Sequence, residues 1–394
     1  MKPANRLVAS VPMVLVALSQ VTPALAEVRA GSQCLALRLP EPPKWISTLV
    51  WDTSRQGLLI ADPAQERLLL YTPGDQRSQS IEISQHSPRS SSGPTSVSLA
   101  GGKIFVQFSD SSAGFLDDTQ KVALTGPSWF DDSVDTSRPR AAGSVANLFT
   151  NWIEHRGQVL GYGAINALGF DPTKQTHSVS SPGVVLADFD ARTGALSHGR
   201  TIDRTTPFDY YRLGYPYFAA NDLGLHYVQM IPGKPATVLR VVAGVPKSVA
   251  VAPAPFDTVP ILQSPTSNAS SPLVVFTQRT VVAGLFGGPG DALFLLTREP
   301  VPGTPKTRWQ VHKMNSKGTV VGVVTLPSSA VHLVIARAPD SWYLAERHGT
   351  GQTWGNQRIE TILQLPASWI EDPEQSPLAL NSGDGVRCEH RPSP

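Results

Sequence analysis

The stretch that decides the fold is residues 45–83, WISTLVWDTSRQGLLIADPAQERLLLYTPGDQRSQSIEI. It contains four short runs rich in apolar residues, at 45–52, 57–62, 67–71 and 79–83. The last two runs are separated by Thr72-Pro73-Gly74-Asp75, a turn sequence in which Gly74 can adopt a positive φ. The stretch therefore predicts a unit of four antiparallel strands.

Paired strands of the same kind recur along the chain, and no long segment has helical periodicity. Five further pairs are expected at 95–99 with 103–108, 148–153 with 158–165, 215–219 with 223–231, 281–286 with 292–297, and 331–336 with 341–346. Six units over residues 45–370 give about 54 residues per unit, somewhat longer than common sheet repeats. Loop-like insertions at 166–183, 252–272 and 300–307 account for the excess.

The composition fits an all-β globular protein. The 394 residues are 41% hydrophobic and 16% charged, include 35 Pro and 32 Gly, and carry a formal net charge of +2. Disorder requires few apolar residues and a high net charge, so this class is excluded. Collagen and coiled coil are excluded as well, since one needs Gly at every third position and the other a charge-rich sequence poor in Gly and Pro.

Residues 1–26 have the features of an export signal. Two basic residues precede a largely apolar run at 7–18, and Ala24-Leu25-Ala26 matches a small-x-small cleavage sequence. We expect cleavage after Ala26, a mature chain that begins at Glu27, and a periplasmic or secreted location. The alternative is an uncleaved membrane anchor, although about a dozen apolar residues fall short of the roughly 20 that a spanning helix needs.

The expected mature chain is electrically balanced. Removal of residues 1–26 takes away Lys2 and Arg6 and leaves 31 basic and 31 acidic residues. Without a basic excess or a run of Lys and Arg, nucleic acid is not an expected partner. No later apolar run is long enough for a membrane span, so none is expected after cleavage.

The repeated units, with phrases such as Trp51-Asp52 and Leu59-Ile60-Ala61-Asp62, resemble six-bladed β-propellers of the NHL-like or TolB-like group found in exported bacterial proteins. The resemblance implies an all-β fold with six four-stranded antiparallel blades over residues 45–370. Residues 27–44 would form an N-terminal segment with a ring-closing strand, and residues 371–394 a C-terminal tail. Such propellers include binding scaffolds, protein-interaction platforms, lactonases and sugar dehydrogenases, so the fold leaves the function open.

The only two cysteines, Cys34 and Cys388, lie near the two ends of the expected mature chain. Because the first and last blades of a ring must touch, and an exported protein meets oxidising conditions, we expect a disulfide between them. Residues 34–39 alternate enough to form a closing strand beside residues 358–365. The alternative is two free thiols in frayed tails, since residues 372–385 have a loop-like composition.

Local catalytic motifs are missing from the sequence. It has no Gly-x-Ser-x-Gly elbow, no His-Glu-x-x-His, no Gly-x-Gly-x-x-Gly and no phosphate-binding loop. The nine histidines are scattered, which disfavours a local metal motif. We therefore assign no catalytic residue, no metal ligand and no cofactor.

Two groups of residues are candidates for ligand binding. The first is a ring of charged residues expected at equivalent ends of second strands, around the mouth of the channel: Asp62, Asp110, Arg298, Glu299, Arg347 and His348. The second is an aromatic cluster, with Tyr210 and Tyr211 as its main candidates, because Tyr combines a flat apolar face with a polar tip; its members are Phe208, Tyr210, Tyr211, Tyr215, Tyr217 and Phe218. The alternatives are ordinary wet loop charges for the ring, and packing between blades for the tyrosines.

These observations predict an exported, monomeric propeller that binds a protein or a polar small molecule through its loop-bearing face. The alternative is an enzyme with its site in the central channel, either a metal-dependent, lactonase-like hydrolase or a sugar-oxidising enzyme. Bound metal in the purified protein would favour the enzyme.

Overall fold

The fold is described from a computed structural model of the chain. It describes residues 33–83, 93–100, 102–108, 113–116, 151–156, 158–165, 168–171, 176–179, 183–190, 195–203, 217–229, 235–242, 245–255, 280–301, 304, 306–330, 332–347, 359–374, 376–378 and 388–390. The expected export signal and the start at Glu27 lie outside these residues, as do Asp110, Tyr210, Tyr211 and His348.

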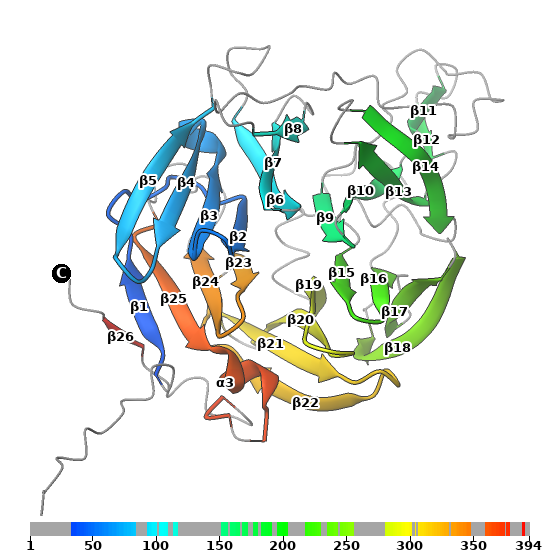
Figure 1. Ribbon diagram of the computed structural model, residues 1–394. Coiled ribbons are helices and arrows are strands. Elements are labelled where there is room, and N and C mark those ends of the chain that lie inside the picture. The colour runs from blue at the N-terminus through cyan, green and yellow to red at the C-terminus, as the bar shows by residue number, and fades with distance from the viewer. Residues whose placement is uncertain are drawn as a thin grey trace, which may run out of the picture.

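Five sheets of four or more strands stand around a common centre (Figure 1). Blade 1 comprises β2 (Thr48–Asp52), β3 (Gly57–Asp62), β4 (Arg67–Thr72) and β5 (Arg77–Glu82); blade 2 comprises β9 (Asn151–His155), β10 (Gln158–Ile165), β13 (Gly183–Asp190) and β14 (Ala195–Asp203). Blade 3 comprises β15 (Phe218–Asn221), β16 (Gly224–Gln229), β17 (Pro235–Val242) and β18 (Val245–Pro255), and blade 4 comprises β19 (Val281–Gly287), β20 (Leu293–Pro300), β21 (Thr307–Met314) and β22 (Val320–Thr325). Blade 5 comprises β23 (His332–Arg337), β24 (Ser341–Arg347) and β25 (Thr361–Pro366), extended by β1 (Leu35–Arg38) and β26 (Glu389–His390).

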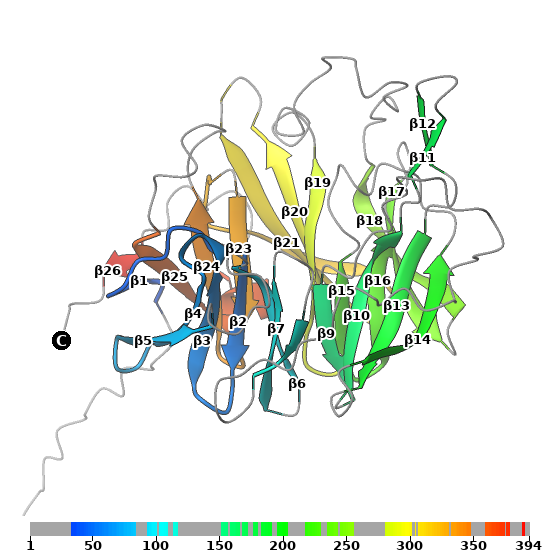
Figure 2. The same cartoon turned by 90° about the horizontal axis from the view of Figure 1, so that it is seen from above.

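A three-stranded sheet lies between blades 1 and 2, formed by β6 (Pro94–Ala100), β7 (Lys103–Phe108) and β8 (Ala113–Phe115). Contacts between innermost strands run from β23 through β2, β6, β9 and β15 to β19. Figure 2 shows the same sheets from above. The protein is therefore an all-β propeller, as predicted. The described residues form five complete blades and this three-stranded sheet, rather than the six complete blades predicted.

The expected inner-strand pairs are confirmed to within a few residues by β6/β7, β9/β10, β15/β16, β19/β20 and β23/β24. The loop expected at 166–183 is wrong in part, because it contains a hairpin of β11 (Leu168–Asp171) and β12 (Thr176–Val179). The turn between β4 and β5 also differs from expectation. Gln76, with φ 52°, is the residue in the left-handed conformation there, and Gly74 is not.

The depth of each strand in the ring explains its composition. All six residues of β3 are buried, so this second strand is covered by neighbouring blades on both faces. The outermost strand of the same blade, β5, is RSQSIE, a mostly polar sequence that suits an edge facing water. A continuous apolar run therefore marks an inner strand, and polar alternation marks the rim.

Apolar clusters fill the spaces between neighbouring blades. Leu58 and Ile60 of blade 1 share one cluster with Tyr343 and Ile362 of blade 5. Neighbouring blades also approach backbone to backbone, since a Cβ added at Gly287 of β19 would lie 1.8 Å from the carbonyl oxygen of Ala220. Only glycine fits at this contact between blades 3 and 4.

The two chain ends close the ring together. β1 pairs antiparallel with β25, from Leu35 opposite Gln364 to Arg38 opposite Thr361, and it pairs in parallel with β26. Cys34 and Cys388 form a disulfide, with their Cα atoms 4.5 Å apart. Both the closing strand beside residues 358–365 and the predicted disulfide are confirmed.

The residues after β25 pack against blades 4 and 5. Helix α3 (Ala367–Glu371) crosses the expected boundary at residue 370 between propeller and tail. Glu371 accepts hydrogen bonds from the Arg337 guanidinium, at 2.8 and 3.2 Å, and from Trp342 Nε1 at 3.1 Å. The N–H of Thr325 donates to the carbonyl oxygen of Leu378 at 3.1 Å. Within the described part of the chain, no helix has the length and apolar character required for a membrane crossing.

We predict that loss of the Cys34–Cys388 bond destabilises the ring strongly. The bond spans 354 residues, for which the chain-entropy model gives roughly 5 to 6 kcal/mol as an upper value. The double variant Cys34→Ser/Cys388→Ser should lower the free energy of unfolding in urea by up to that amount. The reduced wild-type protein should match the variant, and the unreduced, unfolded protein should show no reactive thiol. Two titratable thiols per chain would contradict the bond.

Candidate functional site

A cavity of about 440 Å³ lies on the inner side of the ring, where three innermost strands meet. These strands are β2 of blade 1, β6 of the three-stranded sheet and β9 of blade 2 (Figure 1). Its lining is Thr48, Val50, Trp51, Thr53, Ser96, Val97, Ser98, Leu99, Trp152, Ile153 and Glu154. We call it the channel-side cavity.

The lining combines hydroxyl groups with two indoles. Four residues contribute hydroxyls, and one of these, Thr48, donates its hydroxyl hydrogen to the carbonyl oxygen of Thr95 at 3.2 Å, which ties β2 to β6. Glu154 is the single ionisable residue of the lining that the structure describes. The lining therefore mixes apolar surface with hydroxyl groups and contains one carboxylate residue.

Both indoles are held in place by packing outside the cavity. Trp51 stacks on Tyr343 with ring centroids 5.4 Å apart and planes 7° apart. Trp152 packs on Phe105 at 4.3 Å, and its Nε1 donates to the Gln107 side-chain oxygen at 2.9 Å. Nε1 of Trp51 is buried and finds no hydrogen-bond acceptor in the described part of the chain. A bound molecule would thus meet preformed aromatic walls.

A second cavity, of about 480 Å³, lies between the β9–β10 and β15–β16 turns. Its lining is Glu154, His155, Arg156, Ala220, Asn221 and Asp222. Asn221 is fixed by hydrogen bonds from its amide to the carbonyl oxygens of Asp291 and Ala292, at 3.1 and 3.3 Å. Glu154 belongs to both linings, so this carboxylate stands between the two cavities. We call the second one the turn cavity.

A buried histidine lies close to the turn cavity. His226 of β16 is 2% exposed, and its Nδ1 lies 3.1 Å from the carbonyl oxygen of Gly224. Burial, with the nearby positive charges of Arg240 and His155, lowers the pKa of His226 to about 4, and the hydrogen bond with Gly224 opposes the shift. Burial also lowers the pKa of His155. Both imidazoles are neutral at neutral pH, so they add no positive charge beside Glu154 there.

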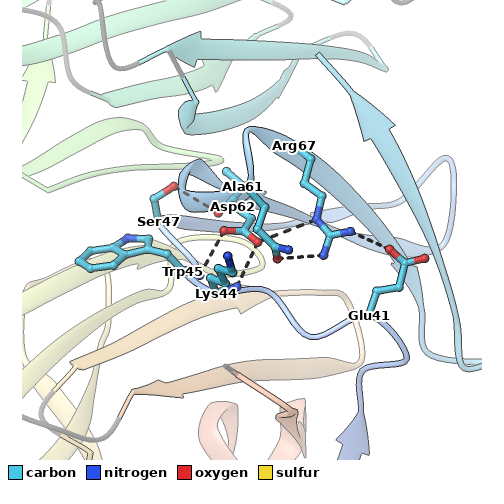
Figure 3. A network of polar contacts seen from close by, with 8 residues as sticks. Glu41, Lys44, Trp45, Ser47, Ala61, Asp62 and Arg67 are labelled. Atoms are coloured by element: carbon cyan, nitrogen blue, oxygen red, sulfur yellow. Dashed lines mark hydrogen bonds and ion pairs between the residues drawn. The ribbon is translucent and has the colours of Figure 1, made fainter. Parts of the chain in front are cut away.

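Asp62, predicted at the wet mouth of the channel, is fully buried in an internal network (Figure 3). Its carboxylate accepts the backbone N–H groups of Lys44 and Trp45, each at 3.1 Å. Arg67 lies 3.9 Å away and also binds Glu41 at 2.7 Å. Burial raises the pKa of Asp62, and the two N–H donors oppose that shift. The network fastens the segment between β1 and β2 onto blade 1.

Arg298 is likewise buried, at 3% exposure, rather than displayed on a loop. Its guanidinium lies over the Trp309 ring, 5.9 Å from the centroid. Burial lowers the pKa of Arg298 to about 10, and the negative charge that Tyr217 can carry opposes the shift. Burial raises the pKa of Tyr217 to about 12. This buried cation therefore belongs to the packing between blades.

Of the remaining ring residues, the structure describes Glu299 and Arg347. Glu299 follows Arg298 on β20 and is partly buried, and Arg347 is the last residue of β24. Among the described residues, no three His, Cys, Asp or Glu side chains group in a way that could hold a metal ion. Sequence reasoning missed the channel-side cavity. The available signal was the cluster of Ser, Thr and Trp residues on strands 48–52, 94–100 and 151–155.

Comparisons with known proteins show similarity of fold only. No protein-family model and no curated protein sequence matches the chain. A gluconolactonase from Xanthomonas campestris is 14% identical with a TM-score of 0.47, and the match covers 84% of this chain and 89% of that one. A calcium-binding regucalcin from Agrobacterium tumefaciens is 12% identical with a TM-score of 0.41, covering 85% and 93%. A putative gluconolactonase, at 13% identity, has a TM-score of 0.44 and covers 85% and 93%.

We predict that Asp62→Ala destabilises the fold by about 2 to 4 kcal/mol, because two N–H groups lose a charged acceptor. The matched control is Asp75→Ala, which removes an exposed carboxylate from the β4–β5 turn and should change stability by less than about 0.5 kcal/mol. Urea unfolding measures both. Equal stability of the two variants would mean that the Asp62 network does not fasten the segment.

We also predict an acid-labile contribution from His226. Its pKa is about 4 when folded and near 6.5 when unfolded, so the unfolded state binds more protons between these values. Stability is therefore highest above about pH 6.5 and falls toward pH 4, by about 3 kcal/mol from this group. The variant His226→Asn should show a smaller fall between about pH 7 and pH 4 in thermal unfolding. An unchanged pH dependence would contradict the assignment.

Proposed function

We propose that the protein is an exported binding protein that takes a small, uncharged, hydroxyl-rich ligand such as a monosaccharide into the channel-side cavity. The observation that supports this most is the lining of that cavity, where Trp51 and Trp152 stand beside the hydroxyls of Thr48, Ser96 and Ser98. Sugars present apolar C–H faces and a rim of hydroxyls. Flat aromatic rings suit the faces, and side-chain hydroxyls, which both donate and accept, suit the rim.

The size and rigidity of the cavity favour such a ligand. A volume of about 440 Å³ falls within the range of small-molecule sites, about 300 to 1,000 Å³. Because Trp51 is stacked on Tyr343 and Trp152 is hydrogen-bonded to Gln107, neither indole has to be ordered on binding. Preorganised walls reduce the entropy cost of association.

We propose that the three-stranded sheet is the sixth blade of the ring, with part of the binding site on its inner strand. Its position supports this, since β6 contacts β2 of blade 1 and β9 of blade 2. Export is supported by the Cys34–Cys388 bond, because disulfides persist in oxidising compartments. The expected signal at residues 1–26 would give the route.

The metal-dependent hydrolase stays as the alternative function. It would require a cation in the channel, and metal analysis of the purified protein separates the two proposals. A stoichiometric divalent ion bound after dialysis would favour the hydrolase, whereas ligand binding by metal-free protein would favour the binding protein.

The test is calorimetric titration of the mature protein with glucose and other neutral monosaccharides. Ser98→Phe should abolish binding by filling the cavity, and Ser98→Ala should weaken it about five- to tenfold through loss of one hydrogen bond. The control Ser80→Phe places the same ring on β5, outside the cavity, and should leave affinity unchanged. Because Ser98→Phe can disturb folding, the result for Ser98→Ala decides. Wild-type protein that binds no sugar would overturn the proposal.

A further inference from the structure

The charge of the channel-side cavity points to a narrower ligand class. Of its described lining residues, only Glu154 is ionisable, so the one full charge that a bound molecule meets is negative. The carboxylate of Glu154 makes no ion pair with any residue that the structure describes. It stands on β9, two residues after Trp152, whose indole helps to wall the same cavity.

The surroundings of Glu154 keep this negative charge available. Arg156 is a lining residue of the turn cavity but not of the channel-side cavity, and no ion pair between Arg156 and Glu154 is found in the described part of the chain. Asp222, on the opposite wall of the turn cavity, adds a second carboxylate on that side. The uncharged imidazole of His155 completes the wall. A cation that reaches Glu154 from the channel meets hydroxyls, indoles and a carboxylate.

We infer that the preferred ligand is a sugar with a free primary amine, whose hydroxyl-rich ring occupies the channel-side cavity and whose ammonium group pairs with Glu154. This inference rests on the proposed function and narrows its ligand class. An ammonium–carboxylate hydrogen bond is shorter and stronger than one between neutral groups. Glu154 is exposed, so water competes for both charges and we expect the pair to contribute modestly.

The same geometry predicts discrimination against related sugars. Glucose lacks the ammonium and leaves the Glu154 carboxylate without a counter-charge. An N-acetylated amine carries no charge either, and its added acetyl group needs room beside Glu154. A free amine should therefore bind best, by about three- to fivefold over both, since an ion pair with an exposed carboxylate contributes modestly.

The experiment is calorimetric titration with glucosamine, glucose and N-acetylglucosamine at about pH 6, where the amine is protonated. Glu154→Gln keeps the shape of the side chain and removes its charge. We expect it to weaken glucosamine binding about three- to fivefold and to change glucose binding by less than about twofold. The control Asp222→Asn removes the carboxylate found only in the turn cavity and should change glucosamine binding by less than about twofold.

The outcomes separate this inference from the proposed function. Wild-type protein that binds glucose and glucosamine equally would overturn the role of Glu154 and leave the sugar site standing. So would a Glu154→Gln variant that weakens both sugars to the same extent. Wild-type protein that binds none of the three sugars would overturn the proposed function, and this inference with it.

Discussion

The structure depends on one constraint: a ring of blades is stable only when its first and last blades are joined. β1 meets this constraint by pairing with β25, so a strand from the start of the chain completes the final blade. The Cys34–Cys388 bond and the parallel pairing with β26 hold both ends at the same point. Every interblade cluster depends on this closure, because each blade is covered only if both neighbours stay in place.

The buried carboxylate of Asp62 connects the segment that follows the closing strand β1 to blade 1. It binds the backbone of Lys44 and Trp45, just after β1 and just before β2. Ser47 then hydrogen-bonds through its backbone N–H to the carbonyl oxygen of Ala61 at 3.0 Å, and Thr48 reaches Thr95. A chain of polar contacts thus connects the closing strand to the wall of the channel-side cavity. Asp62 supports the site through its position in the fold.

Much of the fold could be predicted from local sequence, because inner strands are continuous apolar runs and turns have their own residue types. The closing strand and the disulfide could be predicted as well, because the first and last blades of a ring must touch. The burial of Asp62 and Arg298 could not be predicted in this way, since each lies against a segment outside its own hairpin: residues 44–45 for Asp62 and Tyr217, ahead of blade 3, for Arg298. Polar residues at strand ends look alike whether water or another segment covers them.

The innermost strands on one side of the ring are more polar than those on the other side. The channel-side cavity lies on the more polar side. β15, β19 and β23 read FAAN, VVAGLFG and HLVIAR, so most of their residues are apolar. β2, β6 and β9 read TLVWD, PTSVSLA and NWIEH, where hydroxyl, indole and carboxylate groups replace many of the aliphatic residues. Part of this polarity is satisfied within the ring, since the Thr48 hydroxyl bonds to Thr95 and Trp152 Nε1 to Gln107. Under the proposed function, a polar ligand would meet the remaining hydroxyls from the side where β2, β6 and β9 meet.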